Sequence, residues 1–338
     1  MSGAARSPAD MVTAEHGPAG AVGSSRSPAE LVGAARTGQP RAVARLISLV
    51  EDASPQLREV MALLAPHTRG AQVIGLTGAP GVGKSTATSA LVTAYRARGL
   101  RVGVLAVDPS SPFSGGALLG DRVRMQDHAL DEGVYIRSMA SRGHLGGLAA
   151  STPQALRVLD VAGCDVIVVE TVGVGQAEVD IAGLADTTLV LLAPGMGDGI
   201  QAAKAGILEI ADVFVVNKAD REGADSTARE LRQMLTMAPR GPGEWRPPVV
   251  KTVAARSEGT EELVDALSGH ATWLADSGEG RRRRTARAAD EIVAIALAGL
   301  REKIGDLRGG SALPDLAEAV VAGTTDPYTA ADRLVGAL

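Results

Sequence analysis

Short apolar runs alternate with segments of helical spacing through the centre of the chain, from about residue 73 to about residue 253. Apolar runs of this length, bounded by turn residues, are typical of buried strands. Strands that alternate with helices predict an α/β fold, a mostly parallel sheet wrapped by helices. The expected strands are Val73–Thr77, Val102–Val107, Val134–Met139, Val166–Val169, Thr188–Leu192, Val213–Val216 and Val249–Val253.

Helical spacing without strands predicts a helical extension before this region. Ser27, Pro28 and Glu30 form a helix-start signal, with a capping serine, a proline in the first turn and a glutamate that completes a capping box. Prolines at 40 and 55 divide residues 26–70 into three expected helices, the second with an apolar face of Val43, Leu46, Ile47 and Val50. Residues 1–25, rich in Ala, Gly, Ser and Pro, are expected to be disordered.

A second helical extension is predicted at the other end, over residues 279–338, which leaves residues 71–278 as the central domain. Four arginines, Arg281–Arg284, precede an expected helix over Ala286–Ile304, and two shorter helices follow near Leu313–Val321 and Pro327–Val335. The arginine run is interpreted as a solvated helix start, with a nucleic-acid or localisation patch as the alternative. The long helix carries an apolar face that it cannot bury alone, which favours a homodimer through Ile292, Ile295, Ala296 and Leu300.

Charge and composition narrow the classes of partner. Net charge is −5, from 34 basic and 39 acidic residues, and so gives no electrostatic reason to expect nucleic acid or an anionic membrane. No apolar stretch reaches about 18 residues and no secretory pattern opens the chain, which favours a soluble, cytoplasmic protein. The single cysteine, Cys164, excludes an internal disulfide and is interpreted as a packed core residue.

A glycine-rich octet follows the first expected strand and precedes a helix expected over Thr86–Arg98. It reads Gly78-Ala79-Pro80-Gly81-Val82-Gly83-Lys84-Ser85 and fits the phosphate-loop pattern G-x-x-x-x-G-K-[ST]. Glycines let backbone N–H groups surround phosphate oxygens, and the helix that begins near Thr86 directs its dipole toward them. Lys84 would reach the β- and γ-phosphates, and the Ser85 hydroxyl would bind Mg²⁺.

A second motif, Asn217-Lys218-Ala219-Asp220, follows the strand expected over Val213–Val216. Asp220 can accept hydrogen bonds from the ring N–H and exocyclic amine of guanine, an arrangement that adenine does not present. Together the two motifs predict a site for GTP or GDP. Val253 and Ala254 are further candidates for base contact, although Thr252-Val253-Ala254 departs from the more usual Ser-Ala pattern.

Three acidic residues could complete a magnesium site with Ser85, because Mg²⁺ prefers hard oxygen ligands beside nucleotide phosphates. Asp108 and Glu170 each end an expected strand, and Asp121 lies between Gly120 and Arg122. Each could instead be an ordinary surface acid at a turn.

Taken together, these motifs resemble the MeaB/ArgK family of P-loop GTPases, in which a glutamate at the position of Glu170 is typical. The resemblance rests on residues 78–85, 108–112, 120–125, 170–176, 194–204 and 217–220. It implies a GTP-hydrolysing chaperone that gates cofactor loading and protects or reactivates adenosylcobalamin-dependent methylmalonyl-CoA mutase. It also implies that Ser85, Asp108, Asp121 and Glu170 form the magnesium-linked set.

The resemblance further implies residues that change conformation with the nucleotide. Arg124 resembles a catalytic residue that approaches the phosphates beside Lys84, with a surface salt bridge as the alternative, while Gly173, Gln176, Gln201 and Lys204 resemble switch residues. Two other classes stay open, a nickel-type metallochaperone GTPase and a kinase acting on a transport protein. The five histidines have no metal-ligand spacing, and no acceptor site for a kinase is evident.

Overall fold

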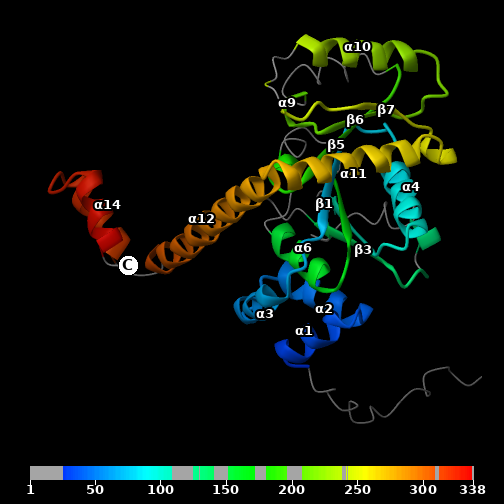
Figure 1. Ribbon diagram of the computed structural model, residues 1–338. Helices are drawn as coiled ribbons and strands as arrows, with labels where there is room; N and C mark the ends of the chain where they lie inside the picture. The colour runs from blue at the N-terminus through cyan, green and yellow to red at the C-terminus, as the bar shows by residue number, and fades with distance from the viewer. Residues whose placement is uncertain are drawn as a thin grey trace, which may run out of the picture.

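Seven strands form one parallel sheet at the centre of the protein (Figure 1). The computed structural model describes residues 26–108, 125–128, 130–140, 151–171, 180–195, 208–237, 241, 243–308 and 312–336. The strands are β1 (Gln72–Thr77), β2 (Val102–Asp108), β3 (Val134–Ala140), β4 (Val166–Thr171), β5 (Thr187–Leu192), β6 (Val213–Val216) and β7 (Val249–Lys251). The predicted α/β class is confirmed, and each of the seven expected strands is present, although β7 ends at Lys251 rather than Val253.

The strand order is β3-β2-β4-β1-β5-β6-β7, with every neighbouring pair parallel. All six residues of β4 and of β5 are buried, which explains why these segments read as continuous apolar runs rather than alternating ones. The register sets Leu76 of β1 beside Glu170 of β4, so the carboxyl ends of the two strands lie at the same edge. Parallel sheets bind ligands at this edge.

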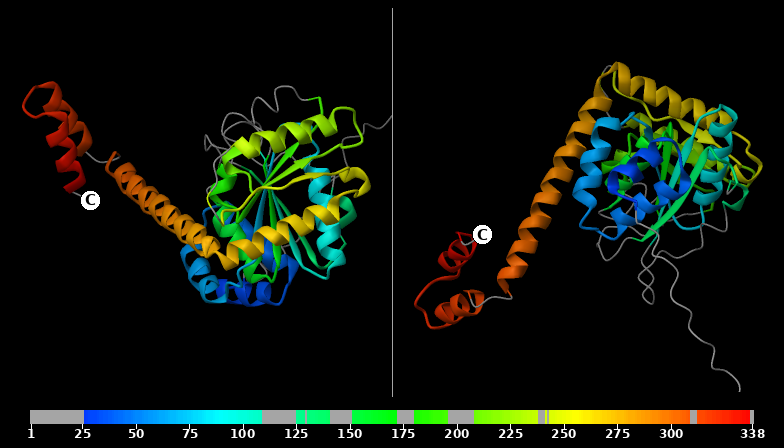
Figure 2. Two further views of the ribbon diagram at one scale, coloured as in Figure 1. Left: turned by 45° about the horizontal axis from the view of Figure 1, so that its top comes forward. Right: turned by 90° about the horizontal axis from the view of Figure 1, so that it is seen from below.

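Helices cover both faces of the sheet (Figure 2). Alternate strand residues divide between the faces, as a period of two requires. One face packs on α4 (Lys84–Ala97) and α11 (Thr260–Asp276) through residues that include Ile74, Leu76, Val104, Val168, Leu189 and Val215. On the other face α6 (Thr152–Val161) covers β2 to β4 and α10 (Ala224–Met237) covers β5 and β6. A one-turn helix, α9 (Leu208–Ile210), precedes β6.

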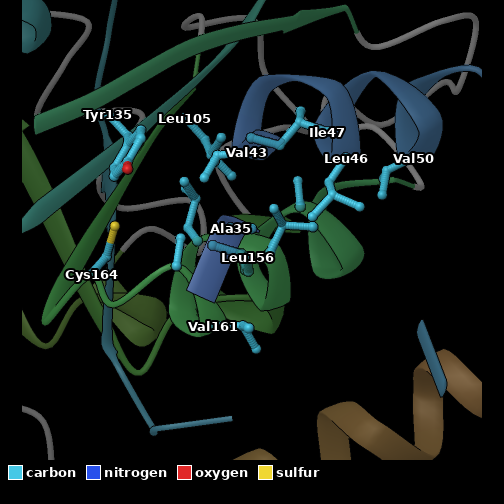
Figure 3. Packing of buried hydrophobic residues seen from close by; sticks show 14 of the residues in the cluster. Ala35, Val43, Leu46, Ile47, Val50, Leu105, Tyr135, Leu156, Val161 and Cys164 are labelled. Atoms are coloured by element: carbon cyan, nitrogen blue, oxygen red, sulfur yellow. The ribbon is translucent and has the colours of Figure 1, made fainter. Parts of the chain in front are cut away.

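The N-terminal helices share the core of the sheet. They are α1 (Pro28–Arg36), α2 (Pro40–Glu51) and α3 (Leu57–Leu64), as the two prolines predicted. Ser27 and Glu30 make both hydrogen bonds of the predicted capping box. Figure 3 shows the expected face of α2 meeting α6 and Leu105 of β2. Cys164 lies in the same cluster, where burial raises the pKa of its thiol to about 12, so it is a packed residue rather than a reactive thiol.

The C-terminal helices extend away from the sheet and its covering helices, and together they are called the C-terminal arm. After α11, the helix α12 (Glu279–Arg308) projects away from the sheet, followed by α13 (Ala312–Val321) and α14 (Pro327–Gly336) (Figures 1 and 2). The apolar face predicted on α12 faces solvent in the single chain, with Ile292 67% and Ile295 50% exposed.

The prediction of a solvated helix start is wrong for two of the four arginines. Arg283 pairs with Asp212 at 3.0 Å and Arg284 with Asp186 at 2.7 Å, and both carboxylates are buried at the amino ends of β6 and β5. The next turn of α12 adds Arg287, which also pairs with Asp186. The helix begins at Glu279, seven residues earlier than its apolar spacing indicated, because these first turns are held by ion pairs instead of apolar contacts.

Replacing Asp186 with asparagine should lower the free energy of unfolding by about 3 kcal/mol, because Arg284 and Arg287 lose a buried counterion. Urea unfolding followed by circular dichroism measures this change. The control is Asp225→Asn, which removes an exposed pair with Lys251 and should leave the free energy of unfolding close to that of wild type. Equal costs for the two variants would contradict the role of the buried cluster.

The ion pairs of Asp186 with Arg284 and Arg287 should make a contribution to stability that is lost in acid. Burial alone would raise the pKa of Asp186, but the Arg284 and Arg287 guanidinium groups outweigh it and lower the pKa below its usual value. A depressed folded pKa means that the stabilisation is complete above about pH 4, the ordinary carboxyl range, and is lost as pH falls through the folded pKa. The stability difference between wild type and Asp186→Asn should therefore hold constant from about pH 5 to 8 and shrink below about pH 4.

Candidate functional site

Parts of three predicted motifs lie at the carboxyl edge of the sheet. Residues 78–83 follow β1, Glu170 lies near the end of β4, and residues 217–220 follow β6. The β1 loop leads directly into α4, as the phosphate-loop interpretation requires.

The β1 loop needs glycine at two positions for different reasons. Gly78 has φ +147°, and a Cβ there would lie 2.3 Å from the Leu191 carbonyl oxygen of β5. Gly83 caps α4 in the left-handed region at φ +97°, and a Cβ there would lie 2.6 Å from the Asn217 side-chain nitrogen. Any larger residue would push the loop away from its neighbours, so the glycines keep the loop tight against the sheet.

The Lys84 side chain folds back over the loop that precedes it. Its Nζ donates to the carbonyl oxygens of Gly78 at 2.7 Å and Ala79 at 3.3 Å. The ammonium group therefore lies at the mouth of the loop, where the amino end of α4 adds partial positive charge. This arrangement favours an anion such as a phosphate group.

Ser85 and Glu170 form the acidic part of the site. The Ser85 hydroxyl donates to Glu170 Oε1 at 2.8 Å, and both residues are buried. A hydroxyl and a carboxylate oxygen at this separation are hard oxygen donors, and they stand beside the loop that would hold the phosphates. The donor set therefore fits Mg²⁺, which takes few protein ligands and completes its shell with water and phosphate oxygens.

Asn217 joins the loops to one another. Its Nδ2 donates to the Val82 carbonyl oxygen at 2.9 Å, while its Oδ1 accepts from Thr252 Oγ1 and from the Ala254 N–H, both at 3.1 Å. The side chain is buried, with 3% of the residue exposed. One amide thus fastens the segment after β6 to the β1 loop and to the segment after β7.

Lys218 and Asp220 belong to the same motif as Asn217. Lys218 takes the left-handed conformation at φ +56° and donates through Nζ to the Gly81 carbonyl oxygen at 2.6 Å. Asp220 has 41% of its side chain exposed, with Arg256 at 3.4 Å. Arg256 pairs more closely with Glu258, at 2.8 Å, so its contact with Asp220 is the longer of its two ion pairs. Such a carboxylate can accept hydrogen bonds from a base.

Several predicted residues fall outside this description. Asp108 ends β2, but its side chain is outside the described residues, as are Asp121, Arg124, Gly173, Gln176, Gln201 and Lys204 in full. The residues brought together are those of the β1 loop through Thr86, with Glu170, Asn217, Lys218, Asp220, Val253 and Ala254.

Thr88 is a site residue that sequence reasoning missed. Its hydroxyl donates to Glu170 Oε2 at 2.8 Å, and the residue is 0% exposed. The signal was available, because Thr88 lies three residues after Ser85 and so shares its face of a helix. Arg256 beside Asp220 was also missed, and no local pattern marks it.

Within the residues described, no three His, Cys, Asp or Glu side chains gather in a way that could hold a metal ion by themselves. The described helices also include none that is long and apolar enough to cross a membrane.

Comparisons with known proteins identify the family and the fold of this chain. The family model of the methylmalonyl Co-A mutase-associated GTPase MeaB matches residues 43–306. A putative GTPase of Pyrococcus abyssi is 48% identical over 89% of this chain and 93% of its own length. The mouse methylmalonic aciduria type A homolog, a mitochondrial protein, is 36% identical over 73% of this chain and 64% of its own.

A solved structure shares the fold. The crystal structure of a LAO/AO transport system kinase superposes with a TM-score of 0.68 at 27% identity, covering 91% of this chain and 96% of the other. The parallel sheet, the loop after β1 and these relatives establish a P-loop nucleoside-triphosphatase fold among proteins named as GTPases. The resemblance predicted from the motifs is confirmed, and the chain belongs to the MeaB family of mutase-associated GTPases.

Proposed function

We propose that this protein is a GTP-hydrolysing chaperone that gates cofactor loading and protects or reactivates an adenosylcobalamin-dependent methylmalonyl-CoA mutase. The observation that best supports binding of GTP is the hydrogen bonding of Asn217, which holds the proposed base-recognition motif against the phosphate loop. Membership of the MeaB family, whose name includes the mutase, supports the client.

In this proposal the phosphate loop and Lys84 hold the β- and γ-phosphates of GTP. The Lys84 ammonium already lies at the mouth of the loop, 2.7 Å from the Gly78 oxygen. It would move from these carbonyl oxygens to the phosphates and offset charge on the oxygens of the transferring phosphoryl group. A water in line with the β,γ-bridging bond would attack the γ-phosphorus, giving GDP and phosphate.

The proposed magnesium-linked set is Ser85, Glu170, Asp108 and Asp121. When bound, Mg²⁺ supplies Lewis-acid charge that neutralises the phosphate oxygens. Ser85 would contribute its hydroxyl directly, and the Glu170 carboxylate, 2.8 Å away, would orient that hydroxyl and the water beside it. Asp108 enters the set because β2 ends there, next to β4 in the sheet.

Guanine selection is assigned to Asp220, with support from Val253 and Ala254. The carboxylate would accept hydrogen bonds from the ring N–H and the exocyclic amine of the base. Asn217 would act indirectly in this scheme, by keeping the 217–220 and 252–254 segments at one distance from the phosphate loop.

Hydrolysis is expected to be slow in the isolated protein. In the part of the chain that the structure describes, no side chain stands out as the residue that orients the water. We assign charge stabilisation to Arg124, and we assign the segments that move with the nucleotide to Gly173, Gln176, Gln201 and Lys204. Contact with the mutase would order these segments and so raise the rate.

The proposed assembly is a homodimer through the C-terminal arm. Ile292, Val293 and Ile295 on α12 are apolar and at least half-exposed, and Leu297 is 48% exposed. A second copy that covers this face would remove them from water.

Hydrolysis by the purified protein, with and without the mutase and with ATP as a control, tests the proposal. We expect hydrolysis of GTP but not ATP, at a rate that rises when the mutase is added. A rate of GTP hydrolysis that does not change when the mutase is added would contradict the chaperone role. Full activity of the isolated protein would contradict the expectation that the mutase stimulates hydrolysis.

A further inference from the structure

The carboxylate of Glu170 is held at both of its oxygens by one helix. Oε1 accepts from Ser85 and Oε2 from Thr88, each at 2.8 Å. Glu170 is 3% exposed and Thr88 is 0% exposed, so water does not compete for these contacts. The two hydroxyls lie three residues apart on α4 and therefore on one face of that helix.

A glutamate needs this second contact more than an aspartate would. Its additional methylene adds a rotatable bond, and the terminal torsion that turns a glutamate carboxylate has a broad energy well. A single hydrogen bond at Oε1 would leave the group free to pivot about that oxygen. The bond from Thr88 to Oε2 removes the pivot and fixes the direction in which Oε1 faces Ser85.

We propose that Thr88 is a positioning residue for the magnesium site, acting through Glu170 to set the affinity for Mg²⁺ in the nucleotide-bound protein. The inference rests on the proposed GTPase function. The hydroxyl touches neither substrate nor metal in this scheme. Its effect is to hold the carboxylate that orients the Ser85 hydroxyl, the type of support whose loss costs about 10- to 100-fold in metal affinity.

A merely structural Thr88 would satisfy a buried carboxylate and nothing more. Its loss would then lower thermal stability without changing the dependence on Mg²⁺, because a buried acceptor without a donor is costly in every ligand state. Mg²⁺ affinity at fixed nucleotide therefore separates the two roles.

The test is dissociation of a fluorescent GDP analogue from the full-length protein over a range of Mg²⁺ concentrations, and in excess EDTA. Thr88→Val keeps the side-chain shape and removes the hydroxyl. We expect its half-saturating Mg²⁺ concentration to rise about 10-fold, with unchanged dissociation in EDTA. Thr88→Ser retains the hydroxyl and should stay within about twofold of wild type. Thr93→Val is the matched control, because the Thr93 hydroxyl donates only to the Ser89 carbonyl oxygen on the exposed side of α4.

A wild-type Mg²⁺ dependence in Thr88→Val would overturn the inference while leaving the proposed GTPase function intact. Thr88→Ala provides a second variant without the hydroxyl. If it kept the wild-type Mg²⁺ dependence while Thr88→Val lost it, the cause would be packing and the inference would also fail. Absence of any Mg²⁺ effect on the wild-type protein would contradict the magnesium site itself, and the proposed function with it.

Discussion

Replacing Lys84 with alanine should lower the rate of GTP hydrolysis by about 10²- to 10³-fold, the usual cost of removing one group that stabilises transition-state charge. Lys84 is the first residue of α4, and its ammonium group lies over the carbonyl oxygens of the phosphate loop. Lys218 also contacts this loop, at the Gly81 carbonyl oxygen, but Lys84 is the lysine that reaches Gly78 and Ala79 from the start of α4. The rate is measured by phosphate release at saturating GTP in the presence of Mg²⁺.

The control for this experiment is Lys251→Ala. Lys251 ends β7 and pairs with the exposed Asp225 at 2.8 Å, so its loss removes one positive charge without touching the phosphate loop. We expect this variant to hydrolyse GTP at nearly the wild-type rate. Similar losses in the two variants would show that Lys84 contributes only through net charge, and the assignment would be wrong.

Replacing Asp220 with asparagine should weaken GTP binding by about 10²- to 10⁴-fold, because two charge-assisted hydrogen bonds to the base are lost or reversed. The same variant should gain affinity for xanthosine triphosphate, whose exocyclic oxygen can accept from the new amide. The geometry favours this reading, since Asp220 is partly exposed and Arg256, at 3.4 Å, approaches only one of its oxygens. Competition against a fluorescent GDP analogue measures both affinities.

Asp225→Asn is the matched control, because it makes the same chemical change at an exposed carboxylate near the start of α10. It should leave both affinities unchanged. If Asp220→Asn bound GTP as tightly as wild type, guanine recognition would have to come from other residues.

Local signals predicted much of the fold. The capping box of Ser27 and Glu30, the prolines that separate α1 to α3 and the apolar strands all depend on residues close together in the chain. The strand predicted over Val249–Val253 is the instructive difference, since β7 ends at Lys251. Thr252 turns its hydroxyl toward Asn217 instead, a contact between residues 35 apart that no window of sequence contains.

Long-range polar contacts were the part that the sequence did not reveal. The docking of Arg284 on Asp186 joins residues 98 positions apart, and an arginine run has the same appearance whether it is solvated or paired. The pairing of Thr88 with Glu170 spans 82 positions. Both contacts depend on which elements the sheet order brings together. The phosphate-loop residues, in contrast, are contiguous in the chain and are recognised from a single local motif.

The most direct test of the central claim, that this site selects a guanine nucleotide, is competition of GTP and ATP for the wild-type protein. The fluorescent GDP analogue is bound first, and each nucleotide is titrated in the presence of Mg²⁺. We predict that GTP displaces it at a concentration about 10²-fold or more below that needed for ATP, as two base-specific hydrogen bonds require. Displacement by both nucleotides at the same concentration would contradict the account.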